Sequence, residues 1–149
     1  TTPGLVTERG TLQSGDYSIK GLEHEFVIER KSISDLLGSI TKNRERFERE
    51  LHRLRGFPFA RVLIVGDPVE VHRAANSKAI FSSITSLEIR WQAPFIWEPS
   101  PDIAARLVER WAWFMFRERA AIGKMEPCPI ESTVCQGRTA AITVTPPTT

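Results

Sequence analysis

Two short runs with the two-residue alternation of β-strands lie close together near the start of the chain and constrain its fold most. Residues 14–19 and 26–31 carry aromatic or aliphatic side chains at alternate positions, as strands do. The polar stretch between them contains Gly21 and favours a turn. We therefore expect a β-hairpin centred between residues 22 and 23, with Ile19 opposite Phe26.

This hairpin brings two carboxylates and a lysine together. The same register puts Asp16 opposite Glu29, and cross-strand neighbours have Cβ atoms roughly 5 Å apart. Because strand side chains alternate between faces, Glu29 and Lys31 project together and Arg30 points away. Two adjacent carboxylates repel each other unless a cation separates them, and oxygen ligands suit Mg²⁺ or Mn²⁺. Lys31 would then position or deprotonate a water molecule, or steady a phosphate.

The acid, acid-x-lysine arrangement is the PD-(D/E)xK pattern of nucleases, but a pattern this short has a simpler explanation. Glu29 and Lys31 would form a solvated pair on a surface hairpin, worth well under about 1 kcal/mol. On spacing alone, this simpler explanation is favoured.

A longer motif surrounds these positions and reverses that preference. It consists of Gly15-Asp16-Tyr17, Glu29-Arg30-Lys31 and Asp35. The motif resembles the signature of the XPF-type endonuclease family, whose members cut branched DNA in repair and recombination. The resemblance is detailed over about residues 11–55, and looser to about residue 120.

The resemblance implies a bacterial or phage-like stand-alone nuclease that hydrolyses DNA phosphodiester bonds, at branched or flap structures. It implies Mg²⁺ or Mn²⁺ bound by Asp16 and Glu29, with Lys31 and Asp35 as further catalytic residues. Family members usually begin with a strand carrying an Asp-x-Arg-Glu element. Residues 1–8 contain no such element, so we expect that first strand to be missing.

Two alternatives from other functional classes remain. The domain could be a non-catalytic DNA-binding partner subunit of a nuclease heterodimer, although its intact motif argues against that. It could also be an interaction scaffold that does not contact nucleic acid. The basic helix described below argues against the scaffold.

Asp35 has two compatible interpretations. Ser32-Ile33-Ser34-Asp35 resembles a capping box, in which Asp35 at the third helical position bonds back to the cap. The helix dipole also favours an acid at this position. The family resemblance makes Asp35 an active-site residue. A cap would fix its carboxylate near the end of the preceding strand.

Residues 33–55 predict a helix that allows a break near residues 41–43. Apolar side chains recur at helical spacing and should face the core: Leu36, Leu37, Ile40, Phe47, Leu51 and Leu54. The outward face has an excess of basic side chains, which suits either i,i+4 ion pairs in solvent or contacts to phosphates. We expect DNA contacts from Arg30, Arg44, Arg46 and Arg49.

The rest of the chain alternates strands and helices. Residues 61–65 predict a strand buried on both faces, residues 77–91 a helix, residues 95–97 a short strand and residues 102–120 a last helix. Asp67 precedes a proline, and its role is more simply that of a turn residue. This order predicts an α/β fold with a mixed central sheet flanked by helices, like that of restriction endonucleases.

The last helix is unusually apolar. Its main face should carry Ile103, Leu107, Trp111, Phe114 and Met115, yet Trp113 and Phe116 make residues 111–116 apolar nearly all round. Such a helix is either a core helix or packs on a partner. XPF-type nuclease domains commonly dimerise, so the resemblance makes this surface a candidate homodimer interface.

Composition sets the remaining bounds. A chain of 149 residues suits one domain, here residues 1–120, followed by a Pro/Thr-rich tail at 121–149 that we expect to be largely disordered or draped on the surface. The net charge of +2 is too small to indicate nucleic-acid binding by itself, and no apolar run is long enough to span a membrane. Cys128 and Cys135 indicate no disulfide framework, so we expect reduced thiols in a cytoplasmic protein.

Overall fold

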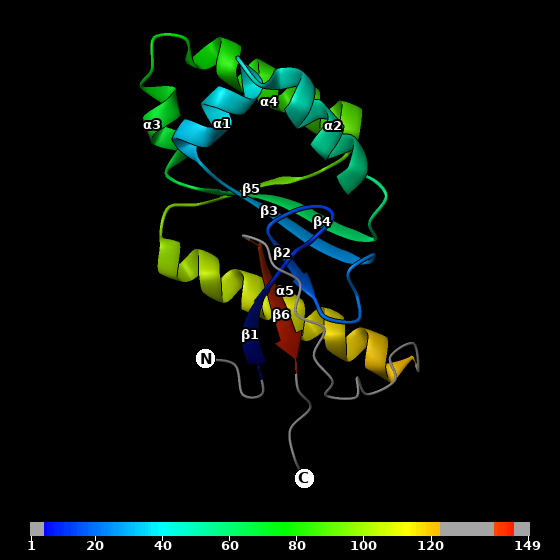
Figure 1. Cartoon of the computed structure of the whole chain (residues 1–149). Helices are drawn as coiled ribbons and strands as arrows, with labels where there is room; N and C mark the ends of the chain where they lie inside the picture. The colour runs from blue at the N-terminus through cyan, green and yellow to red at the C-terminus, as the bar shows by residue number, and fades with distance from the viewer. Residues whose placement is uncertain (1–4, 123–138, 145–149) are drawn as a thin grey trace.

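A six-stranded mixed sheet forms the middle of the protein, in the strand order β1-β6-β2-β3-β4-β5. The computed structural model describes residues 5–122 and 139–144 (Figure 1). In chain order the elements are β1 (Leu5–Gly10), β2 (Tyr17–Ile19), β3 (Phe26–Ser32), α1 (Ile33–Ile40), α2 (Arg44–Leu54), β4 (Phe59–Val65), α3 (Pro68–His72), α4 (Ser77–Trp91), β5 (Phe95–Glu98), α5 (Pro101–Ala121) and β6 (Thr139–Val144).

The pairing directions make this a mixed sheet, and the predicted fold class is confirmed. β3, β4 and β5 run parallel to one another, whereas β2 is antiparallel to β3. At the other edge, β6 runs parallel to β2 and antiparallel to β1. The α1–α4 helices lie on one side of the sheet and α5 on the other (Figure 1).

The hairpin has the predicted register. Tyr17 of β2 pairs with Ile28 of β3, so the next position along each strand sets Asp16 beside Glu29. The first strand of the hairpin, β2, is shorter than the predicted run of residues 14–19, because it begins only at Tyr17. Gly15 precedes it with a φ of 73°, a left-handed conformation that favours glycine.

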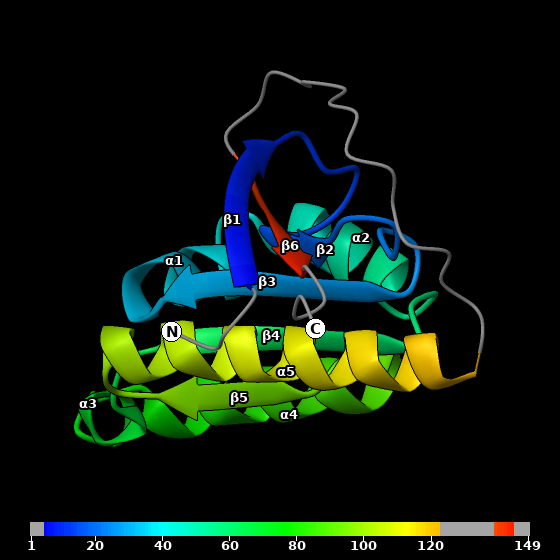
Figure 2. The ribbon, with the colours of Figure 1, turned by 90° about the horizontal axis from the view of Figure 1, so that it is seen from below.

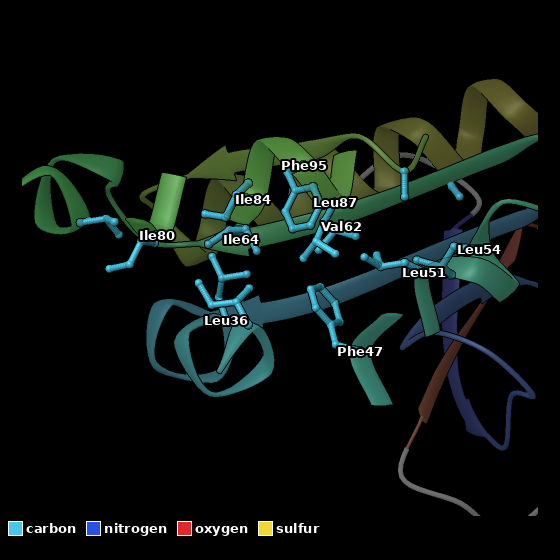
Figure 3. Close-up of a cluster of buried hydrophobic side chains, with 14 of the residues drawn as sticks. Leu36, Phe47, Leu51, Leu54, Val62, Ile64, Ile80, Ile84, Leu87 and Phe95 are labelled. Carbon is cyan, nitrogen blue, oxygen red and sulfur yellow. The ribbon is translucent and has the colours of Figure 1, made fainter. Parts of the chain in front are cut away.

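The larger apolar core lies between the sheet and helices α1, α2 and α4. Val27, Val62 and Ile64 supply the sheet side of this core. Five of the six predicted core positions between residues 36 and 54 are buried in it, and Leu37 packs at its edge. In Figure 3, Leu36 and Phe47 face the side chains of α4, β4 and β5 across this core. The helix also breaks at the predicted place, because α1 ends at Ile40 and α2 begins at Arg44.

The opposite face is covered by α5, which lies along β4 and β5 (Figure 2). The predicted main face of this helix is only partly confirmed. The fully buried residues are Ala104, Val108 and Ala112, whereas the predicted Leu107, Trp111 and Met115 pack against the same core and are partly buried. Two of the expected core residues, Ile103 and Phe114, are 52% and 54% exposed. The small alanines allow the helix backbone to approach the sheet closely, so the larger side chains lie beside the contact line.

Three elements were not predicted. Residues 5–10, where no strand was expected, form β1, and residues 139–144, assigned to the tail, form β6. Both contain β-branched residues that favour strands, and they pair with each other across the length of the chain. The third is the short helix α3, whose N-cap is Asp67: the Asp67 side chain accepts a hydrogen bond from the Val69 N–H at 2.9 Å.

Some expectations fall on parts of the chain that are not described. Cys128, Cys135 and the rest of the tail lie outside the described residues. No helix within 5–122 has the length and apolar character needed to cross a membrane.

We expect Gly15→Ala to lower the free energy of unfolding by about 2 kcal/mol or more. A left-handed backbone costs an L side chain roughly 1–2 kcal/mol, and the added Cβ would overlap Val27 Cγ2. Urea denaturation measures the change. The control is Gly38→Ala in α1, where an added Cβ meets nothing within 4 Å and removing a helical glycine should stabilise by up to about 1 kcal/mol. Equal effects of the two substitutions would contradict this reading of the turn.

Candidate active site

The motif residues line a cavity of about 280 Å³ on the α1–α2 side of β3. The hairpin and the start of α1 contribute Asp16, Glu29, Lys31 and Asp35. The end of α1 and the helix α2 contribute Ser39, Arg46, Phe47 and Glu50, with Asn43 between them. The structure therefore brings the four predicted catalytic side chains together; their catalytic roles stay predictions.

Asp16 is held at the end of β2 by two hydrogen bonds to β3. Its N–H donates to the Ile28 carbonyl at 2.8 Å, and its Oδ2 accepts from the Arg30 N–H at 2.7 Å. Burial raises the pKa of the Asp16 carboxyl, and the Arg30 N–H and the charge of Lys31 act in the opposite direction. The backbone thus fixes this carboxylate in a place that disfavours its charge.

Glu29 is the more strongly perturbed acid. Only 15% of its side chain is exposed. Burial, and next the charge of Asp16, raise the pKa of Glu29 from 4.5 to about 7, although Lys31 opposes the change. The protein's own cations therefore compensate the negative charges of Asp16 and Glu29 only in part.

Lys31 lies between two acids of the cavity wall, Glu29 and Glu50, and an aromatic ring. Its Nζ is 3.1 Å from Glu29 Oε1 and 3.8 Å from Glu50 Oε2. It also lies 4.8 Å from the centre of the Phe47 ring, within the range of a cation–π interaction. With 11% of its side chain exposed, the lysine is oriented by its neighbours rather than by solvent.

Asp35 lies in the first turn of α1, at the edge of the same cavity. Its N–H donates to Ser32 Oγ at 3.1 Å, which confirms Ser32 as the N-cap of α1. The residue is exposed. Its carboxylate can therefore reach solvent, or a ligand in the cavity.

The four predicted DNA-binding arginines lie in different places. Arg46 lines the cavity, and its side chain is 77% exposed although its Nε is 3.4 Å from Glu50 Oε1. Arg49 is exposed and lies 3.9 Å from Glu45 in an i,i+4 pair. Of the four, Arg46 is the one whose side chain joins α2 to the cavity.

Arg44 is directed away from the cavity, whereas Arg30 contributes to its lining and also reaches a second one. Arg44 donates to Ser83 of α4 at 3.4 Å and lies 3.8 Å from Glu48, so it ties α2 to α4. Arg30 presents its N–H to Asp16, whereas the alternation of β3 puts its side chain on the α5 face. There it lines a second cavity of about 240 Å³, together with residues of α5.

Sequence reasoning missed Glu50. Glu50 was not among the predicted site residues, but it lines the cavity and contacts Lys31. A signal was present: Glu50 lies three residues after Phe47 and four before Leu54, within the apolar stripe of α2. A charged residue at such a position needs a partner in the fold.

The donor set suits a hydrated hard cation. Among the described residues, no group of three or more His, Cys, Asp and Glu side chains is arranged to hold a metal ion. Asp16 and Glu29 supply carboxylate oxygens, and Mg²⁺ is commonly held by one or two carboxylates while it keeps several waters. The raised pKa of Glu29 also fits a site that favours an added positive charge.

The sequence matches the model of the ERCC4 domain over residues 2–110. The chain belongs to the ERCC4 domain family. It is 31% identical over 123 residues to the DNA repair endonuclease XPF of Mus musculus, and 30% identical over 122 residues to that of Cricetulus griseus. Each alignment covers 72% of this chain but only 13% of the relative's length.

Solved structures share the fold of this ERCC4 domain. XPF from Aeropyrum pernix gives a TM-score of 0.55 at 18% identity, covering 68% of this chain and 50% of that one. The same protein in complex with DNA gives 0.54 at 18% identity, covering 64% and 48%. The XPF-type resemblance is thus confirmed, whereas the bacterial or phage-like origin stays a prediction.

We expect Glu29→Gln to change how the stability of the metal-free protein depends on pH. Because folding raises the pKa of Glu29 from 4.5 to about 7, the unfolded chain releases this proton first. The wild type therefore loses stability as pH rises through this window, and the variant escapes that loss. Between pH 5 and 8 the free energy of unfolding of the variant should rise by about 2 kcal/mol relative to the wild type.

Urea denaturation at both pH values in the presence of a chelator measures this difference. Glu45→Gln is the matched control, since the Glu45 side chain is 93% exposed. If the free energy of unfolding changes between the two pH values by the same amount in both variants and in the wild type, the pKa of the Glu29 carboxyl is not raised as described.

Proposed function

We propose that this ERCC4 domain is a metal-dependent endonuclease that hydrolyses DNA phosphodiester bonds. The observation that carries the proposal is the placement of Asp16 and Glu29 in one cavity, with Lys31 3.1 Å from Glu29. Membership of the ERCC4 family supports it, as do two relatives that are named DNA repair endonucleases.

Asp16 and Glu29 would hold Mg²⁺ or Mn²⁺. Both are oxygen donors, and neither charge is fully compensated in the metal-free protein, as the raised pKa of each carboxyl indicates. When bound, such a cation would stabilise negative charge on a phosphate and lower the pKa of a water molecule.

Lys31 and Asp35 would act on the substrate side of this pair. The Lys31 ammonium has donors to spare for a phosphate oxygen or a water molecule, and its position is fixed before the substrate arrives. Asp35 stands at the cavity edge, where its carboxylate would orient this set or help to hold a second cation.

The arginines of α2 would contact the DNA backbone. Arg46 is the first candidate, because it is exposed at the cavity. Arg49 lies further out, and Arg44 would first have to leave Glu48 and Ser83. Arg30 lines this cavity and also a second one on the α5 side of the sheet, and its side chain would contact a phosphate from the α5 side. Contacts of this kind hold the backbone in register without reading the sequence.

We expect cleavage of labelled DNA to require Mg²⁺ or Mn²⁺ and to stop on addition of a chelator. Asp16→Asn should abolish cleavage, and Lys31→Ala should lower it by about 100-fold or more, since each removes a group placed at the reacting phosphate. Asp102→Asn and Lys42→Ala, both at exposed positions, are matched controls that should cut like the wild type. Unchanged cleavage by Asp16→Asn would refute the assignment of this cavity as the nuclease active site.

The same assay tests the substrate class. We propose branched DNA, so a flap or a fork should be cut in preference to a plain duplex. A wild-type protein that binds DNA and never cuts it would favour the alternative of a non-catalytic DNA-binding subunit. Absence of DNA binding at low salt would favour a scaffold.

We also propose that the domain forms a homodimer through the outer side of residues 111–116 of α5. Trp113 and Phe116 stack with ring centres 6.4 Å apart, and both are only partly buried against the chain's own core. Phe114 beside them is 54% exposed. This end of the helix therefore offers aromatic surface that a second copy would cover.

We expect Phe114→Glu to convert a dimer into a monomer, because it places a charge within this aromatic surface. Light scattering after size-exclusion chromatography gives the mass at several protein concentrations. The control is Ile89→Glu in α4, which replaces a 74% exposed apolar residue on the other side of the sheet. A wild type that remains monomeric at every concentration would refute the dimer.

A further inference from the structure

The Glu50 carboxylate is shared between two cations of the cavity. Its Oε2 lies 3.8 Å from Lys31 Nζ, and its Oε1 lies 3.4 Å from Arg46 Nε. The Glu50 side chain is 22% exposed, whereas the Arg46 side chain is 77% exposed. Glu50 thus connects an almost buried ammonium to an exposed guanidinium at the cavity.

Lys31 depends on α2 for two of its three contacts. Glu50 and Phe47 are three residues apart and therefore share one face of the helix. One contributes a carboxylate and the other the ring face over which Lys31 Nζ lies. Phe47 is itself fixed, since it is 1% exposed and its ring packs edge-on against that of Phe95, with ring centres 6.2 Å apart.

A surface ion pair does not explain where Glu50 lies. The pair Glu45–Arg49 has the same i,i+4 spacing on α2 as the pair Arg46–Glu50, but both of its side chains are exposed to solvent. Glu50 instead lies close enough to the acid pair for its charge to raise the pKa of both Asp16 and Glu29. This unfavourable proximity is offset only if the carboxylate stabilises the neighbouring cations.

We infer that Glu50 is a positioning residue that holds the Lys31 ammonium in place at the cavity and ties Arg46 to the same carboxylate. The inference rests on the proposed nuclease function and extends it to α2. If Glu29 held a cation, Lys31 would share that carboxylate with it but would keep its contacts with Glu50 and the Phe47 ring. Glu50 would then be the carboxylate that keeps the Lys31 ammonium in place.

The test compares Glu50→Gln with Glu45→Gln, which makes the same chemical change at the exposed pair. Thermal unfolding first checks that both variants are folded. Two-dimensional ¹⁵N NMR of the lysine ammonium groups then reports on Lys31 without any need for activity, because a restrained ammonium exchanges its protons slowly with water. Cleavage kinetics with Mg²⁺ give kcat and KM.

We expect a protected Lys31 signal in the wild type and in Glu45→Gln, and its loss in Glu50→Gln. In the same variant kcat should fall about 10-fold or more, the range typical of residues that orient a reacting group, whereas Glu45→Gln should match the wild type. A protected Lys31 signal that survives in Glu50→Gln would overturn the inference, as would its absence from the wild type or an unchanged kcat.

The two proposals fail separately. If the wild type cuts no DNA but Glu50→Gln loses the Lys31 signal, the nuclease assignment fails and the restraint of Lys31 by Glu50 stands. If the wild type cuts DNA and Glu50→Gln retains both signal and kcat, the nuclease assignment stands and the role of Glu50 is refuted.

Discussion

The alternation of side chains along β3 is the constraint on which the rest of the structure depends. Phe26 and Ile28 enter the core beneath α5, and Val27 enters the core beneath α1, α2 and α4. The same alternation carries Glu29 and Lys31 onto the α2 side, directly beyond the buried part of the strand. One short strand thus joins both cores to the cavity, so the packing of the cores fixes the direction of the charged groups.

The sequence predicted what is decided locally. The hairpin register follows from alternation and a short turn, and with it the approach of Asp16 to Glu29. The break between α1 and α2 and the cap at Ser32 also follow from residues a few positions apart. Such features depend on contacts of low sequence separation, which patterns along the chain report directly.

Features decided by distant contacts were missed. The pairing of β1 with β6 joins segments more than a hundred residues apart, and neither segment has an apolar alternation that marks it alone. The face that α5 buries was predicted only in part because close approach, which favours alanines such as Ala104 and Ala112, outweighed side-chain size. Glu50 was overlooked because its partner Lys31 lies on another element.

The short length of β2 leaves part of β3 without a strand on that side. β2 pairs with β3 at Ile28, and beyond it the Arg30 N–H is met by the Asp16 carboxylate rather than by a backbone carbonyl. Unpaired strand edges invite pairing with other chains. The Asp16 carboxylate therefore occupies a backbone donor of β3 that would otherwise be open to pairing with another chain.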